Sequence, residues 1–192
     1  MEQVGFYYDQ TRCAGCKTCQ VACKDKNKLD VGVILREVRS YQVGTHPQVS
    51  MYHVSAACNH CSHPVCMENC PVGAISKLDD GTVVQDPEAC IGCRMCVMSC
   101  PFGVPRFDAK ERVSRKCDGC HTLREQGYQP ACVEACTFRA LDFGTLDELE
   151  KRHPGETVRF LPALGLTDET GPNTLIRARA DAKSETGKQI TL

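Results

Sequence analysis

The sequence has little of what usually builds a protein interior. It contains no Trp and only six Phe in 192 residues, and Leu, Ile and Val are sparse as well. A conventional apolar core would therefore be thin for a chain of this length. No run of 18 apolar residues occurs, so no segment can span a membrane as a helix by itself. We expect bound inorganic matter or disulfides to supply part of the interior.

Targeting, charge and catalytic signals are also missing. The start, MEQVGFYYDQTRC, has no basic region, apolar stretch or twin arginine that would mark an export signal. The formal net charge of −1 gives no electrostatic reason to expect nucleic-acid binding. The chain has no nucleotide-binding glycine loop and no HExxH motif. We expect a non-catalytic protein that is either cytoplasmic or exported together with a partner that carries the signal.

Cysteine, by contrast, is abundant, at 16 residues, or about 8% of the chain, near the level that indicates a cysteine-held scaffold. The cysteines form four groups, and every group begins with CxxC and ends with CxxxC, which is an internal repeat. Group one is Cys13, Cys16, Cys19 and Cys23; group two is Cys58, Cys61, Cys66 and Cys70; group three is Cys90, Cys93, Cys96 and Cys100; group four is Cys117, Cys120, Cys132 and Cys136.

Group three, CIGCRMCVMSCP, matches the bacterial ferredoxin pattern C-x2-C-x2-C-x3-C-P, in which the fourth cysteine ligates the other cluster of a pair. Group two also ends in Cys-Pro. We therefore interpret the cysteines as ligands of iron–sulfur clusters. Four zinc sites would use the same sixteen thiolates, but zinc sites usually pair two separate CxxC turns and need no third cysteine at the same spacing. Disulfides are the remaining alternative, disfavoured in a reducing compartment.

Local signals predict a few secondary-structure elements. VGFYYD, before group one, is typical of a short strand. AISKL and TVVQD predict two strands joined by a hairpin at residues 79–81. Thr145 followed by Glu148 predicts a capping box for a helix over 146–152. Residues 24–57 are interpreted as an insertion that is polar first and strand-like around SMYHVSAAC. The segment after about Glu156 is expected to be an extended tail that needs a partner to be ordered.

The segments CKTCQVACK, CNHC, CIGCRMC, RKCDGC, ACVEAC and ALDFG resemble the four-cluster electron-transfer subunits of molybdopterin oxidoreductases, most closely the dimethyl sulfoxide reductase branch. The resemblance covers roughly residues 4–150 and is looser over 24–57. It implies an α+β fold of two ferredoxin-like 2[4Fe–4S] modules in a pseudo-twofold arrangement, with insertions and a C-terminal extension. The implied outer module is 1–57 with 102–150, the central module is 58–101, and the extension is 151–192.

The resemblance also implies four ligand sets, each for one [4Fe–4S] cluster. Ferredoxin spacing alone supports the exchange of cysteines between groups two and three, whereas for groups one and four only the resemblance does. Those two groups depart from the pattern, because Lys24 and Thr137 stand where Pro would follow. Set one is Cys13, Cys16, Cys19 and Cys136; set two is Cys23, Cys117, Cys120 and Cys132; set three is Cys58, Cys61, Cys66 and Cys100; set four is Cys70, Cys90, Cys93 and Cys96.

One position distinguishes branches of this family. Nitrate reductase relatives have Trp where Cys93 stands, and they carry a three-iron cluster. The cysteine here implies that set four holds a [4Fe–4S] cluster like the others. Histidines adjoin several cysteines, but the count of cysteine ligands is already complete. We therefore expect packing or hydrogen bonding to the cluster ligands from His60, His63 and His121.

The expected function is a relay of single electrons through four [4Fe–4S] clusters. By resemblance, one end faces a large molybdopterin (Mo or W) catalytic subunit, and the other faces a membrane quinol anchor or a soluble carrier. A free-standing polyferredoxin that moves between soluble redox enzymes is the alternative. The insertion and the tail favour a fixed partner, because a mobile carrier has little use for them. Basic residues beside the cysteines belong to a solvated surface, or they tune the clusters or dock a partner: Lys17, Lys24, Arg94, Arg106, Arg115 and Lys116.

Overall fold

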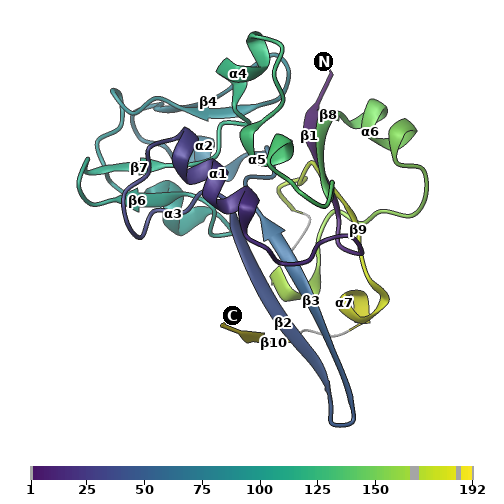
Figure 1. The fold of residues 1–192 in the computed structure, drawn as a ribbon. Helices are drawn as coiled ribbons and strands as arrows, with labels where there is room; N and C mark the ends of the chain where they lie inside the picture. The colour runs from purple at the N-terminus through teal and green to yellow at the C-terminus, as the bar shows by residue number, and fades with distance from the viewer. Residues whose placement is uncertain (1, 165–168, 185–186, 192) are drawn as a thin grey trace.

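The computed structural model describes residues 2–164, 169–184 and 187–191. Short helices and strands alternate along the chain, and Figure 1 shows the helices α1 to α5 gathered in one half of the molecule, with the long β2–β3 hairpin extending away from the body. The strands are β1 (Val4–Asp9), β2 (Glu37–Thr45), β3 (Gln48–Ala56), β4 (Ile75–Lys77), β5 (Val83–Gln85), β6 (Arg106–Asp108), β7 (Val113–Arg115), β8 (Leu141–Thr145), β9 (Thr174–Arg177) and β10 (Lys188–Ile190). The helices are α1 (Thr18–Lys26), α2 (Val65–Glu68), α3 (Met95–Ser99), α4 (His121–Glu125), α5 (Ala131–Glu134), α6 (Leu146–Arg152) and α7 (Ala180–Ser184), with a 3-10 turn over Pro162–Leu164.

The first sheet has the order β8-β1-β9. Strand β1 pairs antiparallel with β8 and parallel with β9. Because β1 has a partner on both edges and packing on both faces, all six of its residues are buried. Phe6 and Tyr8 belong to a core cluster that also contains Cys19, Cys58 and Cys117. The apolar core and the cysteine ligands are therefore continuous.

The second sheet has the order β10-β2-β3. Strands β2 and β3 pair antiparallel from Glu37↔Ala56 at the base to Thr45↔Gln48 at the turn. Only the part of the hairpin near the body is consistently buried, with Val38, Tyr52 and Val54 in the main core. The part of the predicted insertion from Glu37 to Ala56 is thus a hairpin, of which the sequence indicated only the second strand.

The locally predicted elements are confirmed. The first strand covers Val4–Asp9, and β4 and β5 form the antiparallel hairpin around residues 79–81. Helix α6 covers Leu146–Arg152, with both hydrogen bonds of the capping box between Thr145 and Glu148. These elements depend on turn and capping signals within a few residues, which is why the sequence alone specifies them.

The prediction of a tail that needs a partner to be ordered was wrong for the residues that the structure describes. Strand β9 pairs with β1, and β10 pairs with β2. Asn173, Leu175 and Ile176 are at most 4% exposed. The sequence of the tail gives no strand signal because β9 is only four residues long. Its apolar residues pack beside β1, which lies at the other end of the chain.

Within the described ranges, no helix is long and apolar enough to cross a membrane. The chain there is a mixed α and β structure of short elements, as expected for ferredoxin-type domains. The helices that carry cysteines pack in two pairs, α1 against α5 and α2 against α3.

Candidate metal centres

Each CxxC turn has the same backbone feature. The third residue of the turn has a positive φ in all four groups: 69° at Gly15, 45° at His60, 70° at Gly92 and 61° at Gly119. This left-handed conformation suits glycine, and a Cβ on Gly92 would collide with the carbonyl oxygen of Arg112. His60 is the one non-glycine residue among the four positions, so its conformation has to be held by its contacts.

Each CxxxC segment lies in or at the end of a short helix. Cys19 and Cys23 both belong to α1, and Cys66, Cys96 and Cys132 lie in α2, α3 and α5, each four residues before the last cysteine of its group. Residues four apart in a helix share one face. One helical turn therefore presents two thiols side by side, and in every group the two belong to different predicted ligand sets.

Three cavities are each lined by four cysteines that come from more than one group. The first is lined by Cys13, Cys16, Cys19 and Cys136. The second is lined by Cys58, Cys61, Cys66 and Cys100. The third is lined by Cys70, Cys90, Cys93 and Cys96. These are the cysteines of sets one, three and four, and the remaining lining of each cavity is mostly apolar.

The cysteines of set two lie close enough to influence one another's charge. Cys23 and Cys132 lie on the packed helices α1 and α5. Burial, followed by the charges of Cys132 and Cys120, raises the pKa of the Cys23 thiol to about 11. Burial and then Cys23 raise the pKa of Cys117 well above its ordinary value. All four cysteines of set two are buried.

The thiols need a cationic centre before they ionise. All sixteen cysteines are free, and nine of them are buried. Burial, and then the charge of Cys58, raises the pKa of Cys66 to about 12. Within the described ranges, no group of three or more His, Cys, Asp or Glu side chains is arranged to hold a single metal ion. The cysteines instead surround the three cavities and the set-two cluster of thiols described above.

Hydrogen-bond donors point at several of the sulfurs. The backbone N–H of Ala74 donates to Cys70 Sγ at 3.2 Å, and that of Ala140 donates to Cys136 Sγ at 3.2 Å. The hydroxyl of Thr170 donates to Cys61 Sγ at 3.3 Å. Such donors stabilise thiolate sulfur and raise the reduction potential of a bound cluster.

His60 joins two of the sets. It is fully buried, and its Nδ1 accepts the backbone N–H of Val83 at 3.0 Å. Nε2 therefore carries the proton of the neutral ring, and it lies 4.0 Å from Cys117 Sγ of set two. The backbone N–H of His60 donates to Cys58 Sγ of set three at 3.4 Å. Burial, and then the charge of Lys116, holds the pKa of His60 well below its ordinary value, so the ring stays neutral.

Two buried cations suit a negatively charged group. Lys116 lines the set-three cavity, and its Nζ donates to the carbonyls of Val83 and Cys117. Arg36 is 2% exposed, and its Nε and Nη2 have no hydrogen-bond partner among the residues that the structure describes. Four thiolates around a [4Fe–4S] core carry a net charge of about −2 or −3. The thiols, the apolar cavities and these cations therefore fit iron–sulfur clusters.

The other basic residues singled out in the sequence have separate partners. The Arg94 guanidinium lies 3.7 Å from the ring centre of Phe107. Arg106 pairs with Glu37 at 3.0 Å, and Arg115 with Asp108 at 3.1 Å. The sequence did not single out Arg36, Thr170 or Asn173. None of them adjoins a cysteine in sequence, so no local signal could have found them.

Comparisons with known proteins agree with this geometry. Residues 49–146 match the family model of a 4Fe-4S dicluster domain, and residues 10–28 match a 4Fe-4S binding domain. The B subunit of anaerobic dimethyl sulfoxide reductase from Shigella flexneri is 43% identical over 189 residues, which is 94% of this chain and 91% of the relative. The B subunit of the same reductase from Haemophilus influenzae is 42% identical over 192 residues, 95% of this chain and 93% of the relative. Protein NrfC of Escherichia coli K12 is 38% identical over 171 residues, 84% of this chain and 76% of the relative.

The resemblance seen in the cysteine segments is thus confirmed over nearly the whole chain. The sixteen cysteines and the two matched domains fit four [4Fe–4S] clusters. The chain belongs to the family of anaerobic dimethyl sulfoxide reductase B subunits, the iron–sulfur subunits of these reductases.

Proposed function

We propose that the chain relays single electrons through four [4Fe–4S] clusters, one held by each of sets one to four, between a molybdopterin catalytic subunit and a membrane quinol anchor or soluble carrier. A [4Fe–4S] cluster, when bound, takes up and releases one electron at a time. The chain itself holds the clusters, excludes water from them and fixes their order in the relay. The observation that carries the proposal is that cysteines from different groups line common cavities in the predicted combinations.

The order of the relay is proposed to be set one, two, three, four. Cys19 and Cys23, four residues apart on α1, support the adjacency of sets one and two. His60, which contacts sulfurs of sets two and three, supports the middle step. Cys96 in α3 and Cys100 at its end support the adjacency of sets three and four.

The two ends of this order are the most accessible parts of the cysteine array. Cys16 of set one and Cys93 of set four are its two exposed cysteines. Near set four, Ile91 is 64% exposed and Met98 is 71% exposed. Exposed apolar side chains beside an accessible ligand favour docking of a partner at that end.

We also propose the two-module arrangement. The repeated left-handed CxxC turns support it, as does the packing of cysteine-bearing helices in two pairs. Sets one and two would then form the outer module, residues 1–57 with 102–150, and sets three and four the central module, residues 58–101. Residues 151–192 are the extension, which contributes Thr170 and Asn173 to the surroundings of set three.

A fixed catalytic partner is supported mainly by the relatives. Their name is that of one subunit of a reductase, which implies that they assemble with others. The insertion and the tail no longer support a partner, because both pack on the chain itself. We propose that the chain associates with the membrane through that complex, on either side of the membrane.

Elemental analysis of Fe, Zn, Mo and W tests this function, on tagged protein purified without oxygen from its native host. We expect about sixteen Fe per chain with near-stoichiometric Mo or W. Sixteen Fe without Mo or W in any preparation would favour the free polyferredoxin. About four Zn per chain with little iron would refute the relay.

A further inference from the structure

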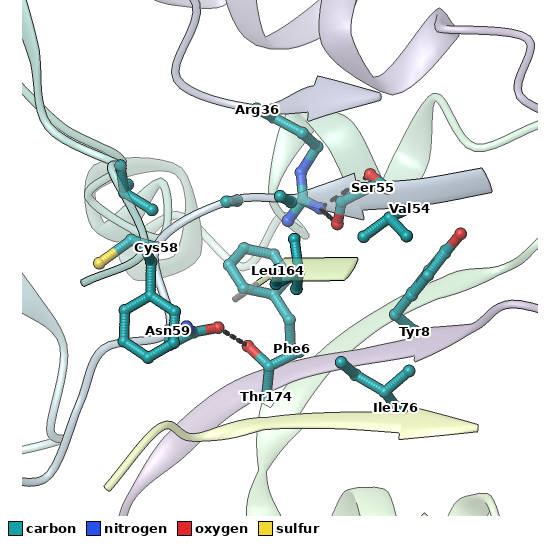
Figure 2. A pocket seen from close by; sticks show the side chains of 14 residues that line it. Phe6, Tyr8, Arg36, Val54, Ser55, Cys58, Asn59, Leu164, Thr174 and Ile176 are labelled. Atoms are coloured by element: carbon teal, nitrogen blue, oxygen red, sulfur yellow. Dashed lines mark hydrogen bonds between the residues drawn. The ribbon is translucent and has the colours of Figure 1, made fainter. Parts of the chain in front are cut away.

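Arg36 lies in the bend immediately before β2, inside the protein. Figure 2 shows its guanidinium beside Ser55, above the ring of Phe6, in a cavity whose lining also includes Cys58. Nη1 donates to the Ser55 hydroxyl at 3.1 Å and to the Ser55 carbonyl at 3.3 Å. The guanidinium carbon is 4.4 Å from the centre of the Phe6 ring. The side chain is therefore held in place by one residue of β3 and one of β1.

The charge of Arg36 has no carboxylate partner. Among the residues that the structure describes, no Asp or Glu forms an ion pair with it. Its Nε and Nη2 are buried and make no hydrogen bond. A buried cation without a counter-charge is strongly destabilising, as are buried donors without acceptors. Burying this guanidinium therefore destabilises the fold, and its packing on Phe6 does not account for its position.

The groups that influence this charge most are cysteines. Burial lowers the pKa of Arg36, but Cys132, then Cys19, Cys117 and Cys23, raise it more, so the net pKa lies above its ordinary value. Three of these four cysteines belong to set two, and the fourth belongs to set one. Reciprocally, the pKa values of Cys19 and Cys23 are raised by burial and lowered by Arg36.

Ser55 extends the influence of Arg36 to set one. Its hydroxyl oxygen accepts from Arg36 Nη1, and it lies 3.5 Å from Cys19 Sγ. Since the oxygen is used as an acceptor, the hydroxyl hydrogen is free to donate to the sulfur. The guanidinium polarises the hydroxyl, which strengthens that donation.

We propose that Arg36 is an internal counter-charge of the cluster array, acting at set one through Ser55 and Cys19, and that it raises the reduction potential of the cluster held there. This inference rests on the proposed function. Reduction adds one negative charge to the cluster, and a buried cation whose Nε and Nη2 lack partners among the described residues stabilises the reduced form more than the oxidised form. Arg36 thus acts on the cluster through its charge and is not one of its ligands. Ser55 carries this effect to set one, because its hydroxyl contacts both Arg36 Nη1 and Cys19 Sγ.

The test compares variants of the iron-loaded chain, kept anaerobic and in its native complex. Arg36→Met removes the charge at similar length, and Arg36→Lys restores a charge without the guanidinium. Arg177→Met is the matched control, because Arg177 also lies over an aromatic ring, at 6.0 Å from that of Tyr7, but pairs with Asp9. Iron content is measured first, and the midpoint potential of each cluster then follows from EPR spectra at poised potentials.

We expect Arg36→Met to change the oxidised-to-reduced ratio of one cluster at least tenfold toward oxidised, which is a fall of about 59 mV for a one-electron couple. Arg36→Lys should restore most of the shift, and Arg177→Met should leave every potential unchanged. Full iron with unchanged potentials in Arg36→Met would overturn the proposal. If Arg36→Met fails to hold iron, a loaded Arg36→Lys with normal potentials supports the need for charge, whereas iron loss in both variants overturns it in favour of a packing role. Wild-type protein without [4Fe–4S] iron would instead refute the proposed function.

Discussion

Replacing Asn173 by Ala would remove side-chain hydrogen bonds that join the C-terminal segment to the turn that carries Cys58 and Cys61. Asn173 is 2% exposed, and its Nδ2 donates to the His60 carbonyl at 2.8 Å and to the Ser62 hydroxyl at 3.2 Å. Those bonds hold His60 in its left-handed conformation, which a residue other than glycine rarely adopts. The turn therefore depends on a side chain 113 residues away along the chain.

The magnitude follows from the bonds that are lost. Nδ2 loses two hydrogen bonds and Oδ1 loses the one that it accepts from Arg159 Nη1 at 3.2 Å, at about 0.5–1.5 kcal/mol each. Gln3 Nε2, at 3.4 Å from the His60 carbonyl, compensates only weakly. We expect a loss of about 2–4 kcal/mol in the free energy of unfolding, or a fall of about 5–15 °C in the unfolding temperature for a chain of this size.

The assay is anaerobic thermal unfolding of the iron-loaded chain at one scan rate, followed by circular dichroism and by the visible absorbance of the clusters. Asn69→Ala is the control, because Asn69 is exposed and its side chain, within the described part of the chain, bonds only the Val65 carbonyl at 2.9 Å. It should change stability by about 0.5 kcal/mol or less. Equal unfolding temperatures for the two variants would refute the reasoning that the tail holds the turn.

Three further predictions concern the cysteine turns. Cys93→Ala should reduce iron from about sixteen to about fifteen per chain and give a three-iron EPR signal that oxygen-free wild-type protein lacks; the same signal in wild-type protein would contradict a [4Fe–4S] cluster at set four. Gly92→Ala should lose most of the iron of set four, because its Cβ meets the Arg112 carbonyl, whereas Gly73→Ala, also at positive φ but with open space around it, should keep the iron; similar iron analyses would disprove the steric argument. His60→Gly relaxes the backbone but leaves the Val83 N–H without its acceptor, so thermal unfolding should show a net loss of about 1–3 kcal/mol, and unchanged stability would show that the ring is dispensable.

Sequence reasoning succeeded where the determining interactions are local. The strand Val4–Asp9, the hairpin at residues 79–81 and the helix Leu146–Arg152 each carry their own pattern or capping signal. Cysteine spacing indicated the metal chemistry for the same reason, because three ligands of a cluster come from one short loop. The resemblance supplied the combinations of cysteines that the cavities bring together.

Sequence reasoning failed where partners are distant. The residues of β9 have no alternation of polar and apolar side chains that marks a strand. They form one because they pair with the edge of β1. Arg36 resembles any charged residue in an insertion until the fold places it where cysteines of groups one and four influence its charge. The other strand of the insertion, β2, alternates weakly and is fixed by pairing with β3 and β10. Contacts of this kind are a property of the tertiary structure, and no local pattern encodes them.

The interleaving of cysteines between groups also has a consequence for biosynthesis. The cysteines of sets three and four have all been made once residue 100 has left the ribosome, because both sets draw only on groups two and three. The cavity of set one begins with Cys13 but cannot close before Cys136 has been made. Iron insertion should thus begin in the middle of the chain and end with the cluster whose first ligand was translated earliest. A ribosome stalled after releasing only the residues up to Cys100 would expose a nascent chain with two complete sets of cysteines, whereas the thiols of group one would still lack Cys136.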